Sequence, residues 1–342
     1  MRVNKYLLQH LDRNKFDVYF LCPEAIVKEC RKEVGNDNIV WRSFSSRFDL
    51  AVKTIREAQC DILYHWKVGG GTLDYFLAHA KLAPIQCTSY GTHGTSGSSD
   101  IDYFLTSSLL EDPNIAQEHY TETAVFLNSY ATCHERNPIT PVSRKDLDLP
   151  EQGALYFCPH RLAKYHPMFD EYLKRILTED QQGHVILLTG KHRQLAESFS
   201  LRLKHHLGET LDKRVIRIPS LRHDKYRNFF SVVTCVLDSP VYAGDLTAHD
   251  AFEFGVPVVT QCGDLLVQRY TSGMYCMMQM ESVVAKNREE YVKTAVRIGT
   301  DTDYREEISH RIKERSELVF DPQVCVPEYE NFFERAVSEY PS

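Results

Sequence analysis

The stretch at residues 237–261, LDSPVYAGDLTAHDAFEFGVPVVTQ, predicts a strand, a loop of small residues, a helix and a second strand. Residues 233–237 form a short apolar run of β type, and the serine, proline, alanine and glycine residues that follow it end the strand. We expect Thr247 to cap a helix that continues over 248–254. A glycine and a proline end this helix before the next strand begins at 258–260.

The loop before that helix is a candidate anion site. A helix N-terminus presents unpaired backbone N–H groups and the positive end of the helix dipole. Asp250 lies three residues beyond Thr247, on the expected first turn, where its carboxylate can face a ribose hydroxyl or complement the dipole. The same features occur in an ordinary strand–helix turn with a routine cap, and the local sequence alone favours that ordinary interpretation over an anion site.

The composition indicates a globular protein of two domains. A chain of 342 residues exceeds one average domain, and its 43% hydrophobic and 25% charged residues supply both a core and a polar surface. The net charge of -7 and the lack of basic runs interleaved with aromatic residues predict no nucleic-acid partner. No apolar stretch is long enough to span a bilayer or to form a secretory signal, so we expect no membrane association.

Cysteine and histidine spacing favours neither disulfides nor a metal. The ten cysteines occur without a C-x-x-C pair, which is typical of reduced thiols in a cytoplasmic protein. His205 and His206 adjoin but match no metal-ligand spacing. We therefore expect a cytoplasmic protein with no metal and no cofactor.

Strands and helices alternate on both sides of a linker, and this order predicts the fold. Before the linker, strands are expected at 18–21, 39–41, 61–65, 84–88 and 103–106, helices at 26–34, 50–58 (capped by Asp49) and 73–79, and a partly helical polar segment at 109–130. After the linker, expected strands at 154–158, 184–189 and 214–218 alternate with expected helices at 168–177, 195–207 and 224–230. The stretch at 237–261 comes next, and four further helices are expected after it, at 265–275, 288–298, 304–317 and 327–337. The proline- and charge-rich segment 137–150, NPITPVSRKDLDLP, is the expected linker. The alternation favours an α/β fold with two parallel-sheet domains, 1–150 and 151–342, that face each other across a ligand-binding cleft.

Several blocks of sequence, taken in order, resemble one known family. The first is YHWKVGGGTLDYFLAHAKLAPIQCTSYGTHGTSGSSDIDYFLTSS from Tyr64, with its APIQ strand, its G-x-x-G-T-S-G loop and the DY after it. The other blocks are CPHRLAKYHP around Lys164, the stretch at 237–261 quoted above, and AKNREEYVKTAVRIGTD from Ala285. Together, from about 61 to about 303, they resemble the catalytic region of the O-GlcNAc transferase and SPINDLY-type glycosyltransferases.

The resemblance implies a GT-B glycosyltransferase fold, in which two Rossmann-like domains face each other and the C-terminal one holds the nucleotide. It implies transfer of GlcNAc from UDP-GlcNAc to serine or threonine hydroxyls of a protein or peptide acceptor, with inversion at the sugar and without a metal. Some members of the family use fucose or glucose donors instead. A sugar-nucleotide epimerase shares the architecture, but the APIQ and GTSG blocks disfavour it.

The resemblance also implies a donor site in the second half of the chain. Lys164 matches the phosphate-binding lysine, and a lysine beside a helix N-terminus can stabilise a leaving diphosphate in place of a metal. Asp250 matches the carboxylate that contacts the ribose. The other implied donor-binding residues are Arg161, Leu221, His223, Tyr226, Asp245, Leu246 and Thr247. Considered alone, Lys164 is more typical of a solvated lysine at a helix start, and Tyr226 fits core packing as well as a donor contact.

The first half supplies the implied sugar and acceptor side, through the loop at 91–99, which we call the acceptor-side loop. Its implied residues are Gly91, Gly94 and Thr95, although glycines there also suit simple turns. His93 and His65 are candidate catalytic bases because histidine titrates near neutrality, yet a lone histidine is more often structural. Asp100 and Asp102 form a D-x-D, which we interpret as a strand entry rather than a metal site.

Three departures from the family pattern bear on the function, and two of them support an alternative. The usual G-H-T-T is replaced by residues 244–247, GDLT, which places the negative charge of Asp245 near the expected diphosphate. The first strand expected of the N-terminal domain and the histidine-bearing loop after it are not found, and no tetratricopeptide repeats precede the catalytic region. Asp245, Leu246 and the short N-terminus favour a degenerate module that binds a nucleotide sugar without transferring it, whereas the missing repeats leave the acceptor unspecified.

Overall fold

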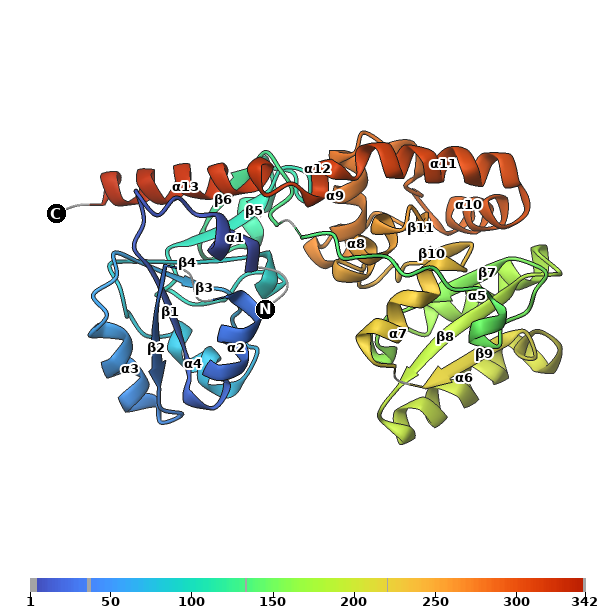
Figure 1. The fold of residues 1–342 in the computed structure, drawn as a ribbon, viewed down its shortest axis with the longest axis horizontal. Helices are drawn as coiled ribbons and strands as arrows, with labels where there is room; N and C mark the ends of the chain where they lie inside the picture. The colour runs from blue at the N-terminus through green and yellow to red at the C-terminus, as the bar shows by residue number, and fades with distance from the viewer. Residues whose placement is uncertain (1–4, 36–37, 133, 220, 341–342) are drawn as a thin grey trace. The chain divides into compact units, whose positions relative to one another are not determined.

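The computed structural model describes residues 5–35, 38–132, 134–219 and 221–340. The chain divides into two compact units (Figure 1), one of Met1–Glu135 with Val319–Ser342 and one of Arg136–Leu318. Each unit carries parallel strands with helices packed around them. The predicted α/β class is therefore confirmed, while the predicted boundary between residues 150 and 151 differs from the observed division.

The first unit contains a pair of parallel strands and a four-stranded parallel sheet. The pair is β1 (Val18–Pro23) with β2 (Ile39–Phe44), and the sheet has the order β3 (Ile62–His65), β4 (Ile85–Ser89), β5 (Tyr103–Ser107), β6 (Thr123–Leu127). Its helices are α1 (Lys5–His10), α2 (Val27–Val34), α3 (Phe48–Arg56), α4 (Thr72–Ala78) and α13 (Pro322–Glu339). Three-residue or four-residue 3₁₀ turns lie at Glu24–Ile26, Tyr90–Thr92 and Ala116–His119.

The C-terminal helix α13 belongs to the first unit, and its contacts explain why the predicted domain boundary was wrong. The Tyr329 hydroxyl donates to the backbone oxygen of Ala131 at 2.7 Å, and its ring packs edge-on against Tyr64. The carboxylate of Glu328 accepts hydrogen bonds from the backbone amides of Asn128 and Ser129. An amphipathic helix pattern shows that a helix will pack, but it does not specify which sheet receives it.

The second unit is built on a five-stranded parallel sheet. Its order is β11 (Val258–Val259), β10 (Cys235–Leu237), β7 (Leu155–Cys158), β8 (His184–Gly190), β9 (Val215–Pro219). Its helices are α5 (Met168–Glu179), α6 (Arg193–Asp212), α7 (His223–Asn228), α8 (Leu246–Glu253), α9 (Tyr270–Met277), α10 (Arg288–Thr300) and α11 (Thr302–Arg315), and α12 (Glu317–Phe320) contains the point where the chain passes to the first unit. All four residues of the central strand β7 are buried, so this strand is the middle of the core.

The expected linker at 137–150 is attached to the second unit rather than lying between domains. The Arg227 guanidinium donates to the backbone oxygens of Asn137 and Pro138, each at 3.3 Å. Arg227 also forms a buried ion pair with Glu253 at 2.8 Å, and the backbone amide of Asn137 donates to the same carboxylate. These contacts fix the start of the segment on α7 and α8.

Two local predictions were wrong. The segment at 109–130 was expected to be partly helical, but it contains one short 3₁₀ turn and the strand β6, TAVFL, in parallel register with β5. A β-branched and apolar run of this kind prefers a pleated surface when a neighbouring strand edge is available. Helix α3 begins at Phe48 with Arg47 at its N-cap, so Asp49 lies inside the first turn and is not the cap.

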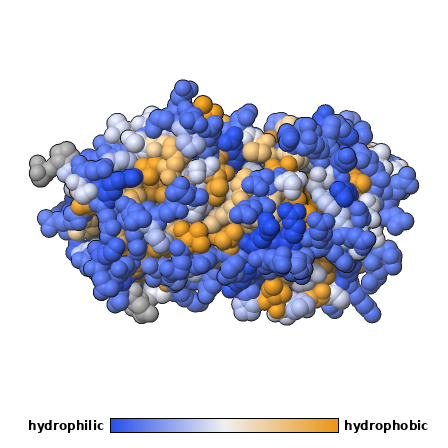
Figure 2. Space-filling model, turned by 90° about the horizontal axis from the view of Figure 1, so that it is seen from above, coloured by the Kyte–Doolittle hydropathy of each residue, from blue (hydrophilic) through white to orange (hydrophobic). Residues whose placement is uncertain are grey.

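The surface matches the composition. Hydrophilic residues cover most of the face drawn in Figure 2, and hydrophobic residues gather in smaller areas between them. Folded proteins commonly expose apolar atoms in this way. Among the described residues, none of the helices combines the length and apolar character that crossing a bilayer needs.

Candidate functional site

The loops that follow β7 and β10 meet at one edge of the second sheet. These strands are parallel neighbours, with Cys235 opposite Tyr156, so the chain leaves both at the same edge. Open α/β sheets bind ligands beyond this carboxyl edge. The loop after β7 carries Lys164, and the loop after β10 leads into α8. The candidate lysine and the candidate helix start therefore lie at the same edge of the sheet.

A buried carboxylate, Asp238, holds this edge together. Its side chain is 1% exposed. Oδ1 accepts hydrogen bonds from the backbone amides of Ser239 (3.0 Å) and Gly244 (2.7 Å) and from His160 Nε2 (2.9 Å), and Oδ2 accepts from the hydroxyls of Thr260 (2.8 Å) and Thr271 (2.6 Å). A charge taken out of water needs such a complete set of donors, and this set orders the loop at 238–245.

His160 links Asp238 to the helix start. Because the carboxylate only accepts, Nε2 carries the hydrogen and Nδ1 is left as an acceptor. Nδ1 lies 3.3 Å from the Thr247 hydroxyl, which therefore donates inward. Burial lowers the pKa of His160 more than Asp238 raises it, so the ring is neutral. Sequence reasoning missed this role, because His160 contacts residues about eighty positions away along the chain.

Gly244 is required where the loop passes His160. A Cβ atom at this position would lie 2.1 Å from the Thr247 hydroxyl oxygen and 2.7 Å from His160 Cε1. Both distances are far inside van der Waals contact, so any side chain would displace the helix start. The glycine is therefore needed for close packing around the histidine.

Helix α8 begins two residues earlier than expected, at Leu246. Asp245 is its N-cap residue and forms no side-chain cap, so Thr247 is the second helical residue and the prediction that it caps the helix was wrong. Asp250 lies on the second turn instead of the first, and it is 2% exposed. The intrahelical bonds begin with the amides of Ala248 and His249 on the Asp245 oxygen. The amides of Leu246 and Thr247 therefore have no acceptor within the helix, as anion binding requires.

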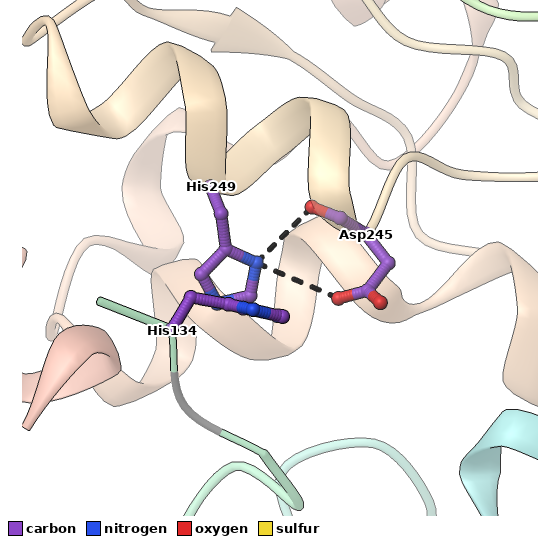
Figure 3. Close-up of side chains that lie close together, drawn as sticks. All are labelled: His134, Asp245 and His249. Carbon is purple, nitrogen blue, oxygen red and sulfur yellow. Dashed lines mark hydrogen bonds and ion pairs between the residues drawn. The ribbon is translucent and has the colours of Figure 1, made fainter. Parts of the chain in front are cut away.

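The carboxylate of Asp245 is directed along the helix. Oδ1 lies 3.5 Å from His249 Nδ1, and the same nitrogen lies 3.1 Å from the Asp245 backbone oxygen (Figure 3). The Asp245 side chain is 15% exposed. This orientation places the negative charge of Asp245 against His249. The repulsion between Asp245 and a bound diphosphate, which the sequence led us to expect, is therefore reduced.

Lys164 contacts the loop that leads to α8. Its ammonium donates to the backbone oxygen of Ala243 at 3.3 Å and lies 4.0 Å from the centre of the Tyr242 ring. Burial lowers the pKa of Lys164, and the carboxylates of Asp238 and Asp245 act in the opposite direction. Lys164 is also one of the residues that line a depression of about 480 Å³. It is thus a half-buried cation at the loop, which disfavours the interpretation as a solvated lysine.

The other donor-side predictions have mixed outcomes. Arg161 is exposed and is the N-cap residue of the 3₁₀ turn at Leu162–Lys164. Leu221 lies on the loop before α7, and His223 begins that helix, although its side chain lies outside the described part. The ring of Tyr226 packs against Phe157 and Phe230, which favours the core interpretation.

The acceptor-side loop is fixed at its start. A Cβ atom on Gly91 would lie 2.7 Å from the Trp66 backbone oxygen, and the Thr92 hydroxyl accepts from the Val68 amide at 3.1 Å. His93 is exposed and has a φ of 65°, in the left-handed region that disfavours side chains. Gly94 and Thr95 follow in an irregular segment.

Two further predictions in the first unit concern His65 and Asp102. Burial lowers the pKa of His65 to about 4, which makes this histidine a weak base at neutral pH. Asp102 precedes β5, and its carboxylate accepts from the Lys81 ammonium at 2.6 Å and from the Gln86 amide at 2.7 Å. These contacts support the interpretation of the D-x-D as a strand entry.

Comparison with known proteins identifies relatives of the chain. A model described as glycosyl transferase family 41 matches residues 127–325, more than half of the chain. The chain is 27% identical over 294 residues to a probable UDP-N-acetylglucosamine–peptide N-acetylglucosaminyltransferase SPINDLY of Hordeum vulgare, covering 84% of this chain and 30% of that protein. It is 24% identical over 297 residues to the similarly named SEC protein of Arabidopsis thaliana, covering 79% and 29%. The chain thus spans about a third of the length of these relatives.

Solved structures show the same fold. An O-GlcNAc transferase of Thermobaculum terrenum superposes with a TM-score of 0.84 at 21% identity, over 97% of this chain and 64% of that chain. A sucrose-phosphate synthase from Thermosynechococcus elongatus gives a TM-score of 0.59 at 14% identity, over 87% and 81%. At these identities the likeness establishes the fold, which is the predicted GT-B fold of two Rossmann-like domains.

Proposed function

Because the chain belongs to glycosyl transferase family 41, we propose that it transfers GlcNAc from UDP-GlcNAc to serine or threonine hydroxyls of a protein, with inversion and without a metal. The observation that carries this proposal is the arrangement of Lys164 and the α8 start around one buried carboxylate, Asp238. The names of the SPINDLY and SEC relatives support the donor and the kind of acceptor. A cytoplasmic location is part of the same proposal, and the described cysteines are all free thiols.

The leaving diphosphate gains charge as the sugar bond breaks, and this charge must be stabilised. In the proposal, the Lys164 ammonium and the amides of Leu246 and Thr247 meet it, so a fixed cation and helix dipole act where a metal acts in other enzymes. The Thr247 hydroxyl points toward His160, so Thr247 contributes its amide rather than its side chain. Asp238 and Gly244 position these groups without touching the phosphate.

Asp250 is proposed to contact the ribose. It lies four residues after Leu246, so it is on the same face of α8 as the first helical amide, one turn further along. A nucleotide whose phosphate rests on the helix start therefore places its sugar toward this carboxylate. Arg161, Leu221 and His223 remain proposed contacts on the donor side.

The acceptor-side loop is proposed to shape the sugar and acceptor side, with His93 as the candidate base. His93 is exposed, whereas the pKa of His65 is lowered to about 4, so His93 is the better suited of the two. The base acts by accepting the proton of the acceptor hydroxyl as the oxygen attacks the sugar.

A second candidate function is nucleotide-sugar binding without transfer. The observation that favours it is Asp245, a carboxylate at the N-cap of the helix whose amides are proposed to bind the diphosphate. Binding of UDP together with failure to transfer sugar to any acceptor protein would identify this function.

Calorimetric titration tests the proposal. UDP and UDP-GlcNAc are titrated in EDTA into the protein, into Lys164→Ala and into a control, Lys204→Ala, which removes an exposed lysine of α6. We expect the affinity of Lys164→Ala to fall about tenfold or more, as for loss of a charged hydrogen bond, and the control to match the unaltered protein. UDP-glucose and GDP-fucose tested alongside establish the donor. No UDP binding by the unaltered protein would overturn the donor site.

A further inference from the structure

Glu122 is a buried carboxylate that faces the acceptor-side loop. It immediately precedes β6 and is 1% exposed. Its Oε1 accepts from the Ser96 amide at 2.7 Å, and its Oε2 accepts from the hydroxyls of Thr95 at 2.7 Å and Thr121 at 3.1 Å. Three donors, two of them from the loop, thus converge on one side chain that lies 26 residues further along the chain.

Thr95 extends this contact to the rest of the loop. Its hydroxyl donates to Glu122 and accepts from the backbone amides of Gly97 at 3.1 Å and Thr121 at 3.2 Å. The single hydroxyl hydrogen of Thr95 is therefore used on the Glu122 carboxylate. Thr95, which the resemblance assigns to the sugar and acceptor loop, therefore has its hydroxyl engaged by Glu122, Gly97 and Thr121.

The loop is also held at its two ends, by contacts that carry no charge. At its end, the buried Ser98 hydroxyl donates to the Ala78 backbone oxygen at 2.6 Å and accepts from the Asp100 amide at 3.1 Å. At its start, Gly91 packs against Trp66. Glu122 is the charged anchor between them, and charge-assisted hydrogen bonds are roughly twice as strong as neutral ones.

We propose that Glu122 is a positioning residue that sets the conformation of the acceptor-side loop through Thr95 and Ser96. The inference rests on the proposed function, in which this loop shapes the sugar and acceptor side. Glu122 itself touches no substrate. Removal of its carboxylate breaks the hydrogen bonds that hold Thr95 and Ser96, so residues 95–97 lose their fixed conformation. The positions of the neighbouring His93 and Gly94 then change as well.

The test compares Glu122→Ala and Glu122→Gln with Glu118→Ala, which removes an exposed carboxylate nearby. Hydrogen exchange reports the protection of the amides at 91–99, calorimetry reports UDP affinity, and a radiolabelled transfer assay reports KM and kcat. In Glu122→Ala, we expect loop protection to fall about tenfold or more, as for a lost charged hydrogen bond. UDP affinity should stay unchanged and the acceptor KM should rise, while Glu118→Ala matches the unaltered protein.

Thr95→Val gives an independent readout if Glu122→Ala does not fold. It keeps the shape of the side chain but removes the hydroxyl that joins Glu122 to Gly97, so loop protection should again fall. Unchanged protection in folded Glu122→Ala, or in Thr95→Val where that variant replaces it, overturns the inference. Lack of transfer by the unaltered protein overturns the proposed function instead, because the exchange measurement needs no acceptor.

Discussion

The loop before α8 and the acceptor-side loop are both rich in small residues, and each is ordered by a buried carboxylate. The two carboxylates differ in where their partners come from. Asp238 accepts from donors in the loops after β7 and β10, from Thr260 directly after β11 and from α9. Glu122 takes its donors from the loop and from Thr121, its neighbour in sequence. The first carboxylate therefore supports the packing of a whole sheet edge, and the second the conformation of one loop.

The largest effect is expected from Asp238→Ala. It leaves five donors of the second unit, including two amides and a histidine, without their acceptor in a dry environment. The loss of a buried charged partner costs about 3–5 kcal/mol in the free energy of unfolding. Urea denaturation measures it, with Glu209→Ala, an exposed site on α6, as the control. A loss no greater than that of the control would show that the donors find new acceptors.

A smaller effect is expected from Glu122→Ala. Its donors lie near the surface of one loop, so water can replace part of what is lost. We expect a decrease of about 1–3 kcal/mol in the free energy of unfolding, confined to the first unit. Urea denaturation with Glu118→Ala as the control measures the decrease. A cost equal to that of Asp238→Ala would contradict the contrast between a sheet-wide and a local anchor.

Thr247→Val should lower stability more than it lowers affinity. The hydroxyl faces His160 Nδ1, so its loss leaves that nitrogen without a donor and costs about 0.5–1.5 kcal/mol. The amide of Thr247 remains, so the affinity for UDP should change by no more than about twofold. Thr247→Ser, which keeps the hydroxyl, is the matched control. A large loss of UDP affinity in the valine variant would mean that the hydroxyl turns outward to the phosphate.

The sequence predicts the two loops well and their anchors poorly. The order of β10, loop and α8 was predicted because the signals for it are local, as were most of the other strands. The cap at Thr247 was wrong because its hydroxyl is taken by His160, a contact that spans 87 residues. Glu122 lies in the segment that was expected to be partly helical, so its position at the start of a strand beside the loop was hidden. Anchors that act across the fold leave no spacing pattern in the chain.

Acidification should weaken the two anchors at different pH values, and each effect should be small. Burial lowers the pKa of His160. The unfolded chain therefore takes up a proton below about pH 6.5 that the folded second unit does not, and stability is lost as the pH falls through that value. Burial acts to raise the pKa of Glu122. The hydrogen bonds from Ser96 and Thr95 act in the opposite direction and outweigh burial, so the pKa is lowered from its ordinary value. Its contribution is present above the unfolded value of about 4.3 and is lost only at lower pH.

Each variant is compared with the unaltered protein at every pH. This comparison is needed because the lowered pKa of His65 adds its own loss of stability to the first unit at acidic pH. Protection factors of the acceptor-side loop, corrected for intrinsic exchange, should differ between Glu122→Gln and the unaltered protein near neutral pH and converge below about pH 4. The free energy of unfolding of His160→Asn should depend less on pH between about 5 and 7 than that of the unaltered protein. Convergence of the loop protection factors near pH 6 instead would mean that the carboxylate of Glu122 is not stabilised by Thr95 and Ser96. The contrast between the two anchors would then rest on the second unit alone.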